Sequence, residues 1–157
     1  MQQSRLWLEV TAAAPEVSLE RALADGANDD DSGRLTGQHE AELLLYRRLM
    51  EILDGMLVLD QYVTPADEVA VTRHVARTVP ERMRSAVAER ALLELAVAAR
   101  ASGAVPASSR GRPAADLTAL QDVYRLRAVD AARRAARPVV AAVRAERVDS
   151  VAGRLRS

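Results

Sequence analysis

The chain has 157 residues, of which 49% are apolar, and it contains no Cys, no Phe and no Lys. The lack of Cys excludes disulfides, zinc–thiolate sites and cysteine nucleophiles, and no run approaches the ~18 apolar residues of a membrane span. The net charge of zero hides a division, because residues 1–72 hold 5 Arg and 14 acidic residues whereas residues 73–157 hold 17 Arg and 8 acidic residues.

The apolar residues are mainly Ala, Val and Leu, and the only aromatic residues are Trp7, Tyr46, Tyr62 and Tyr124. Ala and Leu favour helices, and small side chains suit closely packed helices. We therefore predict an all-α fold, a bundle of five or six helices that forms a single domain over residues 1–157. The first residues lack a basic segment followed by an apolar stretch, so we expect a cytoplasmic location.

The first residues alternate between polar and apolar over 4–10, which predicts a short extended arm. Leu6, Trp7 and Leu8 of this arm would pack onto helices or onto a neighbouring chain. Ser18 can cap a short helix over residues 19–25. Residues 26–37 contain three consecutive Asp and predict a loop; they lack the ligand spacing of a calcium site, so no metal is expected there.

A long helix is predicted over about residues 38–62. Its apolar side chains are so widely distributed that we expect a central helix covered on more than one side. Gly55 lies in its middle, where a close helix crossing would explain it. The main apolar stripe consists of Leu45, Leu49, Ile52, Met56 and Leu59.

Residues 64–67 carry the strongest local signal in the chain. Thr64 can cap a helix whose first residue is Pro65, and Asp67 stands where the acid of a capping box belongs. This helix should run to about Thr78. Another helix should open at Pro80, run to about residue 101 and end before Gly103, with its apolar stripe at Ala88, Leu92, Leu95 and Ala99.

Residues 102–113 are rich in Ser, Gly and Pro and predict a linker. It would divide the domain into an acidic helical lobe over 1–101 and an Arg-rich helical pair over 114–157. The pair comprises a helix over about 114–136, a kink or break at Pro138, and a final helix to about residue 152. The apolar side of the final helix would contain Ala141, Ala145, Val148, Ala152 and Leu155.

The 114–136 helix separates into two apolar faces at 100° per residue. Leu117, Leu120, Tyr124, Ala128, Ala131 and Ala135 form the predicted core face. Val123, Leu126 and Val129 form a second apolar line among arginines. Either Arg stems cover this line while their charged groups reach water, or it contacts a partner protein, a second copy of the chain or a nucleic-acid backbone.

The candidates for catalysis are few. His39 and His74 both read as ordinary polar residues, and no phosphate loop, nucleophile motif or metal-ligand spacing is present. Glu51, Asp54 and Asp60 could line one side of the long helix, where they would either pair with Arg or, if buried, perform acid–base chemistry. A small helical enzyme using buried carboxylates is therefore an alternative.

The leading interpretation is a non-enzymatic helical subunit or adaptor of a larger assembly, without cofactors and without membrane contact. It would dock an anionic partner, most concretely the backbone of RNA or single-stranded DNA, through its Arg-rich C-terminal helices. The alternative is a protein-only regulator that binds other subunits or copies of itself, in which acidic and basic halves pair within or between chains. The predicted partner-binding residues are Arg110, Arg112, Arg125, Arg127, Arg133, Arg134, Arg137, Arg144, Val123, Leu126 and Val129.

Overall fold

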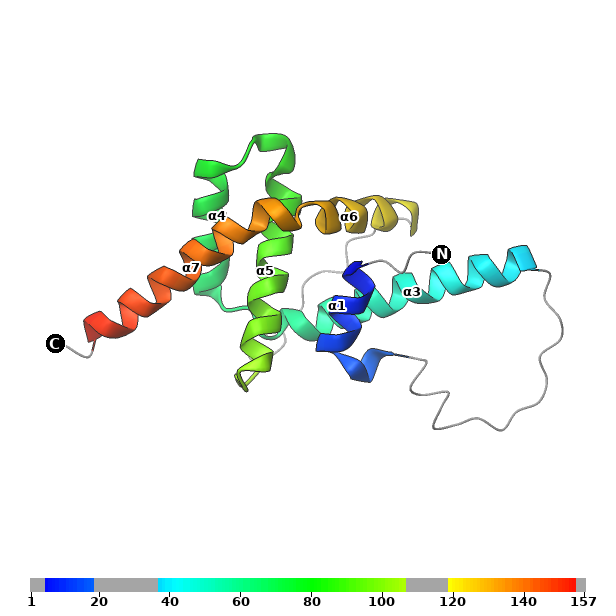
Figure 1. Cartoon of the computed structure of the whole chain (residues 1–157), viewed down its shortest axis with the longest axis horizontal. Helices are drawn as coiled ribbons and strands as arrows, with labels where there is room; N and C mark the ends of the chain where they lie inside the picture. The colour runs from blue at the N-terminus through cyan, green and yellow to red at the C-terminus, as the bar shows by residue number, and fades with distance from the viewer. Residues whose placement is uncertain (1–4, 19–36, 107–118, 155–157) are drawn as a thin grey trace. The chain divides into compact units, whose positions relative to one another are not determined.

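A computed structural model describes residues 5–18, 37–106 and 119–154, and within these ranges the fold is all-α, with no strand. The chain forms two compact units, residues 1–58 and 59–157. Each unit is described by itself below. The helices are α1 (Arg5–Ala13), α3 (Gly37–Asp60), α4 (Pro65–Thr78), α5 (Arg84–Ala101), α6 (Ala119–Ala131) and α7 (Arg133–Arg154), with short 3₁₀ helices at Pro15–Val17 and Glu81–Met83 (Figure 1).

The N-terminal segment of the first unit is a helix, so the prediction of an extended arm is wrong. Leu6, Trp7 and Val10 of α1 are buried, at a spacing that lies on one side of a helix. The polar–apolar alternation covers so few residues that it fits a short helix as well as an extended arm, so the pattern did not identify the structure. The helix predicted over residues 19–25 and the acidic loop lie outside the described residues.

The close crossing predicted at Gly55 is confirmed. A Cβ atom at Gly55 would lie 2.2 Å from Val10 Cγ1 and 3.4 Å from Val17 Cγ2, so only glycine lets this part of α3 approach the N-terminal helices so closely. The same pair of helices shares a buried polar contact, in which Trp7 Nε1 donates to Glu51 Oε2 at 2.6 Å. The Arg48 guanidinium lies 5.2 Å from the centre of the Trp7 ring.

The second unit begins with the predicted capping box, which is confirmed. Thr64 Oγ1 accepts a hydrogen bond from the Asp67 amide at 3.2 Å, while the Thr64 amide donates to Asp67 Oδ2 at 3.0 Å. The helix α4 ends at Thr78, as predicted, and the Arg84 side chain donates to the carbonyl groups of Ala76 in its last turn and of Val79 just after it. Gly103, with φ of +77°, follows the end of α5.

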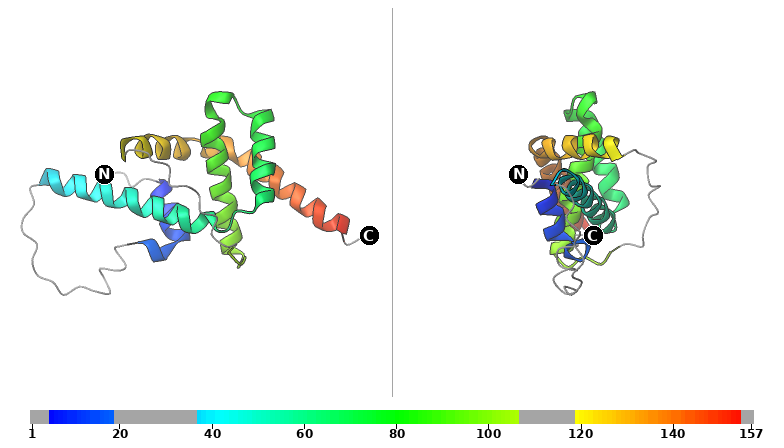
Figure 2. Two further views of the ribbon diagram at one scale, coloured as in Figure 1. Left: turned by 180° about the vertical axis from the view of Figure 1, so that it is seen from behind. Right: turned by 90° about the vertical axis from the view of Figure 1, so that its right-hand side faces the viewer.

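The core of the second unit lies between α4, α5, α6 and α7, and α5 is its central helix. Buried side chains occur on several sides of α5, and Figures 1 and 2 show α4 antiparallel to it while α7 crosses both. The long helix α3 was expected to be the covered one, but several of its large apolar side chains, among them Leu43, Leu45 and Leu57, are exposed. One cluster of buried core residues in the second unit consists of Val71, Val75, Val79, Val87, Ala91, Leu95, Ala132, Ala136, Val139, Val140 and Val143.

The C-terminal helices differ from the prediction in where the chain bends. The break between α6 and α7 lies at Ala132, and α7 continues through Pro138. The proline ring crowds the carbonyl of Arg134, so the break at Ala132, six residues before Pro138, lies outside the turn that the proline distorts. The Ala132 amide still donates to the Ala128 carbonyl at 2.9 Å, so the chain bends with little loss of helical bonding.

The predicted division at residues 102–113 is not where the two compact units separate. Helices on both sides of that segment share one core, and the boundary lies between Val58 and Leu59. Residues 107–118 lie outside the described residues, and the single-domain assignment stays a prediction. Among the helices that the structure describes, none is long and apolar enough to cross a membrane.

Candidate functional site

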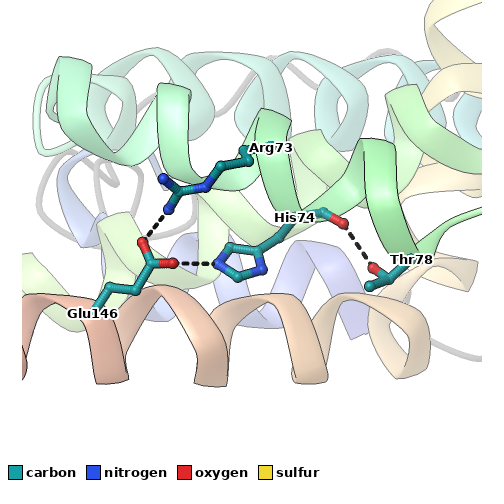
Figure 3. Close-up of polar contacts among 4 residues, drawn as sticks. All are labelled: Arg73, His74, Thr78 and Glu146. Carbon is teal, nitrogen blue, oxygen red and sulfur yellow. Dashed lines mark hydrogen bonds and ion pairs between the residues drawn. The ribbon is translucent and has the colours of Figure 1, made fainter.

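The C-terminal half of α7 is fixed to α4 by two groups of charged side chains. Glu146 accepts hydrogen bonds from Arg73 and from His74, whose Nε2 lies 2.8 Å from Glu146 Oε1 (Figure 3). Arg147, the next residue along α7, donates a hydrogen bond to Asp67 at the start of α4. Both groups join residues about 75 positions apart in the sequence, so they define how α7 lies across α4.

Asp67 has a dual role in this arrangement. It is 1% exposed, and its two oxygens divide between the cap of α4 and the Arg147 guanidinium. Burial by itself raises the pKa of the Asp67 carboxyl, but hydrogen bonds from Arg147 and Thr64, together with the Arg147 charge, outweigh burial and hold that pKa below its usual value. Asp67 is therefore ionised in the folded protein.

Glu146 has a lowered pKa for a similar reason, although it is exposed. The hydrogen bond with His74 is the largest cause, desolvation opposes it, and the charges of Arg73 and His74 add to the lowering of the pKa. His74 was expected to be a polar boundary residue. Its side chain is 20% exposed and lies between α4 and α7.

An exposed stripe runs along the side of α6 and α7 that faces away from the core. Its residues recur every three or four positions, so they stay on one side of the helices across the bend at Ala132. The stripe contains four arginines, one tyrosine and no acidic residue. We call it the outer stripe, and its residues are Tyr124, Arg127, Ala131, Arg134, Arg137, Ala141, Arg144 and Val148.

The structure inverts the faces that the sequence predicted for these helices. Leu126 and Val129, predicted to contact a partner, are 5% and 0% exposed and belong to the core face. Tyr124, predicted to lie in the core, is 63% exposed. The larger Leu and Val side chains bury more apolar area than an Ala-rich face does, so they turn inward. Leu126 and Val129 are therefore corrected from docking residues to core residues.

The remaining predicted docking residues divide between three environments. Arg127, Arg134, Arg137 and Arg144 are exposed on the outer stripe. Arg125 is turned away from it, with its Nε 3.6 Å from Glu89 Oε1 and its Nη2 3.9 Å from Asp122 Oδ1. Val123 and Arg133 are half-buried, and Arg110 and Arg112 lie outside the described residues.

Tyr124, Ala131, Ala141 and Val148 are the stripe residues that the sequence reasoning placed on the wrong side. A signal for the correct assignment existed, because the inward residues keep a helical spacing straight through Pro138. Taking Pro138 as the end of a helix divided this stripe in two. The continuous inward stripe is Leu126, Val129, Ala132, Ala136, Val140 and Val143.

The carboxylates of the enzymatic alternative lie in different surroundings. Glu51 is 3% exposed, bonds Trp7 and lies 3.6 Å from Arg47 Nε, whereas Asp54 is exposed. A shallow hollow of the surface along α4 is lined by Glu68, Val69, Thr72, Arg73 and Ala76. The side chain of His39 lies outside the described residues. Among the side chains described, no three His, Asp or Glu residues gather as a metal site requires.

Comparison with known proteins gives a family but no function. No curated protein and no solved structure matches the chain. A family model does match it, over residues 4–135, which include every described helix from α1 to α6 and the first residues of α7. The chain therefore belongs to DUF6545, a family of unknown function.

Proposed function

We propose that this protein is a non-enzymatic helical adaptor that docks an anionic partner through the outer stripe, most concretely the phosphate backbone of RNA or single-stranded DNA. The observation that carries the proposal is the composition of the stripe. Four exposed arginines and one exposed tyrosine follow one side of α6 and α7, with one carboxylate, the half-buried Asp130, between Arg127 and Arg134.

The stripe is suited to a nucleic-acid backbone in length and chemistry. From Arg127 to Arg144 it spans about 25 Å at the rise of an α-helix, long enough to follow several phosphates of one strand. The planar Arg guanidinium binds phosphate with two parallel hydrogen bonds. Tyr124 adds one aromatic face on which a base can stack. With a single aromatic side chain in the stripe, we expect contact mainly to the backbone and little sequence preference.

The ion pairs of the second unit favour this surface over a general attraction to negative charge. Arg73 and Arg147 are held by carboxylates of the neighbouring helix, and Arg125 is held by Glu89 and Asp122. These arginines are occupied within the fold. The outer stripe therefore concentrates cationic groups that are available to a partner.

The test is binding of a labelled single-stranded RNA of mixed sequence, followed by fluorescence anisotropy over a series of salt concentrations. We expect the logarithm of the affinity to fall linearly as the logarithm of the salt concentration rises. Each arginine that contacts a phosphate contributes about 0.7 to that slope for a single strand. The double variant Arg134→Gln/Arg137→Gln should weaken binding about 10-fold or more and reduce the slope by about 1.4.

The matched control is Arg77→Gln/Arg82→Gln, which removes the same charge from exposed positions of α4 and the following 3₁₀ helix. It should change the slope little. If both double variants weaken binding equally, the effect belongs to net charge and the outer stripe is not the site. Absence of any salt-sensitive binding by the unaltered protein would overturn the nucleic-acid form of the proposal.

A further inference from the structure

The side of α7 that faces α4 changes from apolar to charged after Val143. Val140 and Val143 are buried in the core, and the positions three and four residues beyond Val143 are Glu146 and Arg147. Residues at these spacings lie on the same side of a helix. Among the side chains that the structure describes beyond Val143, which are those of residues 144–149, none is buried. The end of α7 is therefore held on α4 without a hydrophobic core of its own.

The side of α4 that faces α7 changes in the same way. Four residues before the core residue Val71 stands Asp67, which is 1% exposed and bonds Arg147. A second ion pair, between Arg73 and Glu146, lies nearer the surface (Figure 3). Well-packed apolar side chains hold two helices together as well as a buried ion pair does, or better. Charges at these positions therefore favour a contact that is reversible.

Both ion pairs are open to competition from dissolved anions. The Arg73 and Glu146 side chains are 43% and 44% exposed, so water and salt screen their attraction. The Arg147 side chain is 45% exposed although its partner Asp67 is buried, so an anion can reach the guanidinium. An Arg guanidinium binds phosphate with two parallel hydrogen bonds, as it binds a carboxylate. A phosphate-rich anion is therefore able to replace both carboxylates.

We propose that the end of α7, residues 144–154, is a latch that a phosphate-rich anion opens by taking Arg73 and Arg147 from their carboxylates. In the open state this segment leaves α4, while the core up to Val143 stays folded. Segments with few buried apolar contacts open locally in this way, and a helix end without tertiary contacts frays in water. Opening also moves Arg144, the last arginine of the outer stripe, so the latch controls how far that surface extends.

Hydrogen exchange of the full chain, followed by NMR residue by residue, tests the latch. The probe is inorganic tripolyphosphate, and sodium chloride of the same ionic strength is the reference that only screens charge. We expect tripolyphosphate to raise the exchange rates of the backbone amides over residues 145–151 about 10-fold more than sodium chloride does, because it competes for the two arginines. The amides of residues 139–143 should keep their exchange rates, since they belong to the core.

Three variants identify the residues of the latch. Glu146→Gln removes one carboxylate and should raise exchange over residues 145–151 without any anion. Asp149→Asn is the matched control, because Asp149 is exposed on the same end of α7 and makes no ion pair with the residues that the structure describes; it should change exchange little. The double variant Arg73→Gln/Arg147→Gln should exchange fast in buffer alone and respond no further to tripolyphosphate, which separates these two arginines from any anion bound elsewhere.

Three outcomes would rule the latch out. The first is tripolyphosphate that raises exchange no more than sodium chloride does, and the second is an equal effect of Glu146→Gln and Asp149→Asn. The third is exchange that rises over residues 139–143 together with residues 145–151, because the whole unit then unfolds and α7 has no end that opens separately. None of these measurements involves nucleic acid, so the latch and the proposed function are tested independently.

Discussion

At the scale of single residues, Asp67 links the start of α4 to the far part of α7. The same carboxylate completes the cap with Thr64 and holds Arg147. Its pKa is lowered in the folded protein from an ordinary value of 3.8. A group with a lowered folded pKa stabilises the fold fully above the unfolded pKa, and that contribution is lost as pH falls through the folded pKa.

We therefore expect Asp67→Asn to destabilise the protein by about 1–2 kcal/mol at neutral pH, since a cap and a charged hydrogen bond are both weakened. The difference from the unaltered protein should shrink as pH falls below about 4. Urea unfolding at pH 7 and at several acidic pH values measures it. Glu81→Gln removes an exposed carboxylate and should leave the pH dependence unchanged; a difference for Asp67→Asn that persists undiminished at low pH would contradict the role assigned to its charge.

Gly55 provides a second prediction at this scale, because two effects of opposite sign compete there. Alanine is favoured over glycine inside a helix by about 1 kcal/mol. At this position, however, the added carbon would lie 2.2 Å from a methyl group of Val10. We expect the clash to win, so that Gly55→Ala displaces α1 and lowers the stability of the first unit.

Trp7 is the only tryptophan in the chain and it is 6% exposed, so its fluorescence reports this displacement. Gly55→Ala should shift the emission to longer wavelength and lower the unfolding midpoint. Leu45→Ala, an exposed change on the same helix, should do neither. A Gly55→Ala protein that is more stable than the original would show that α1 does not pack at this point.

At the scale of whole elements, prediction from the sequence succeeded where the signal is local. Thr64, Pro65 and Asp67 define the start of α4 through contacts between residues at most three apart, and Gly103 ends α5 in the same local way. Which side of α6 and α7 is buried depends instead on how these helices pack against α4 and α5. Residues that are close in the sequence do not determine that packing. A break assigned to Pro138 then concealed the continuous inward stripe.

The corrected assignment of buried and exposed sides can be tested by replacing Val with Ala at two positions of α7. Val143 is 1% exposed and Val148 is 68% exposed. Val143→Ala should cost about 1.5–2 kcal/mol, since two methyl-sized groups leave the core. Val148→Ala should change stability by a few tenths of a kcal/mol at most. Chemical denaturation compares the two, and because both changes alter helix propensity equally, a larger cost at Val148 would restore the faces predicted from the sequence.

At the scale of the whole molecule, the division of charge follows the division into units. Residues 1–58 contain 5 Arg and 11 acidic residues, and residues 59–157 contain 17 Arg and 11 acidic residues. Composition predicted an acidic and a basic part but placed their boundary at the Ser-, Gly- and Pro-rich segment. Core packing decides the boundary instead, because α4 and α5 bury their apolar sides against α6 and α7. The sequence therefore predicted the arginines of the candidate site, but it did not predict which side of α6 and α7 faces the core.

One core cluster of the second unit is formed by residues of α4, α5 and the C-terminal helices, so we expect residues 59–157 to fold without the rest of the chain. We expect this fragment to be helical by circular dichroism and to unfold cooperatively, and Val143→Ala should destabilise it as much as it destabilises the full chain. Among the side chains that the structure describes, residues 1–58 contribute fewer buried apolar side chains than residues 59–157, and a small unit buries a smaller fraction of its surface on folding. That fragment should be less stable than residues 59–157, which the same denaturation measures. A fragment 59–157 that fails to fold would mean that its core is completed by the first unit.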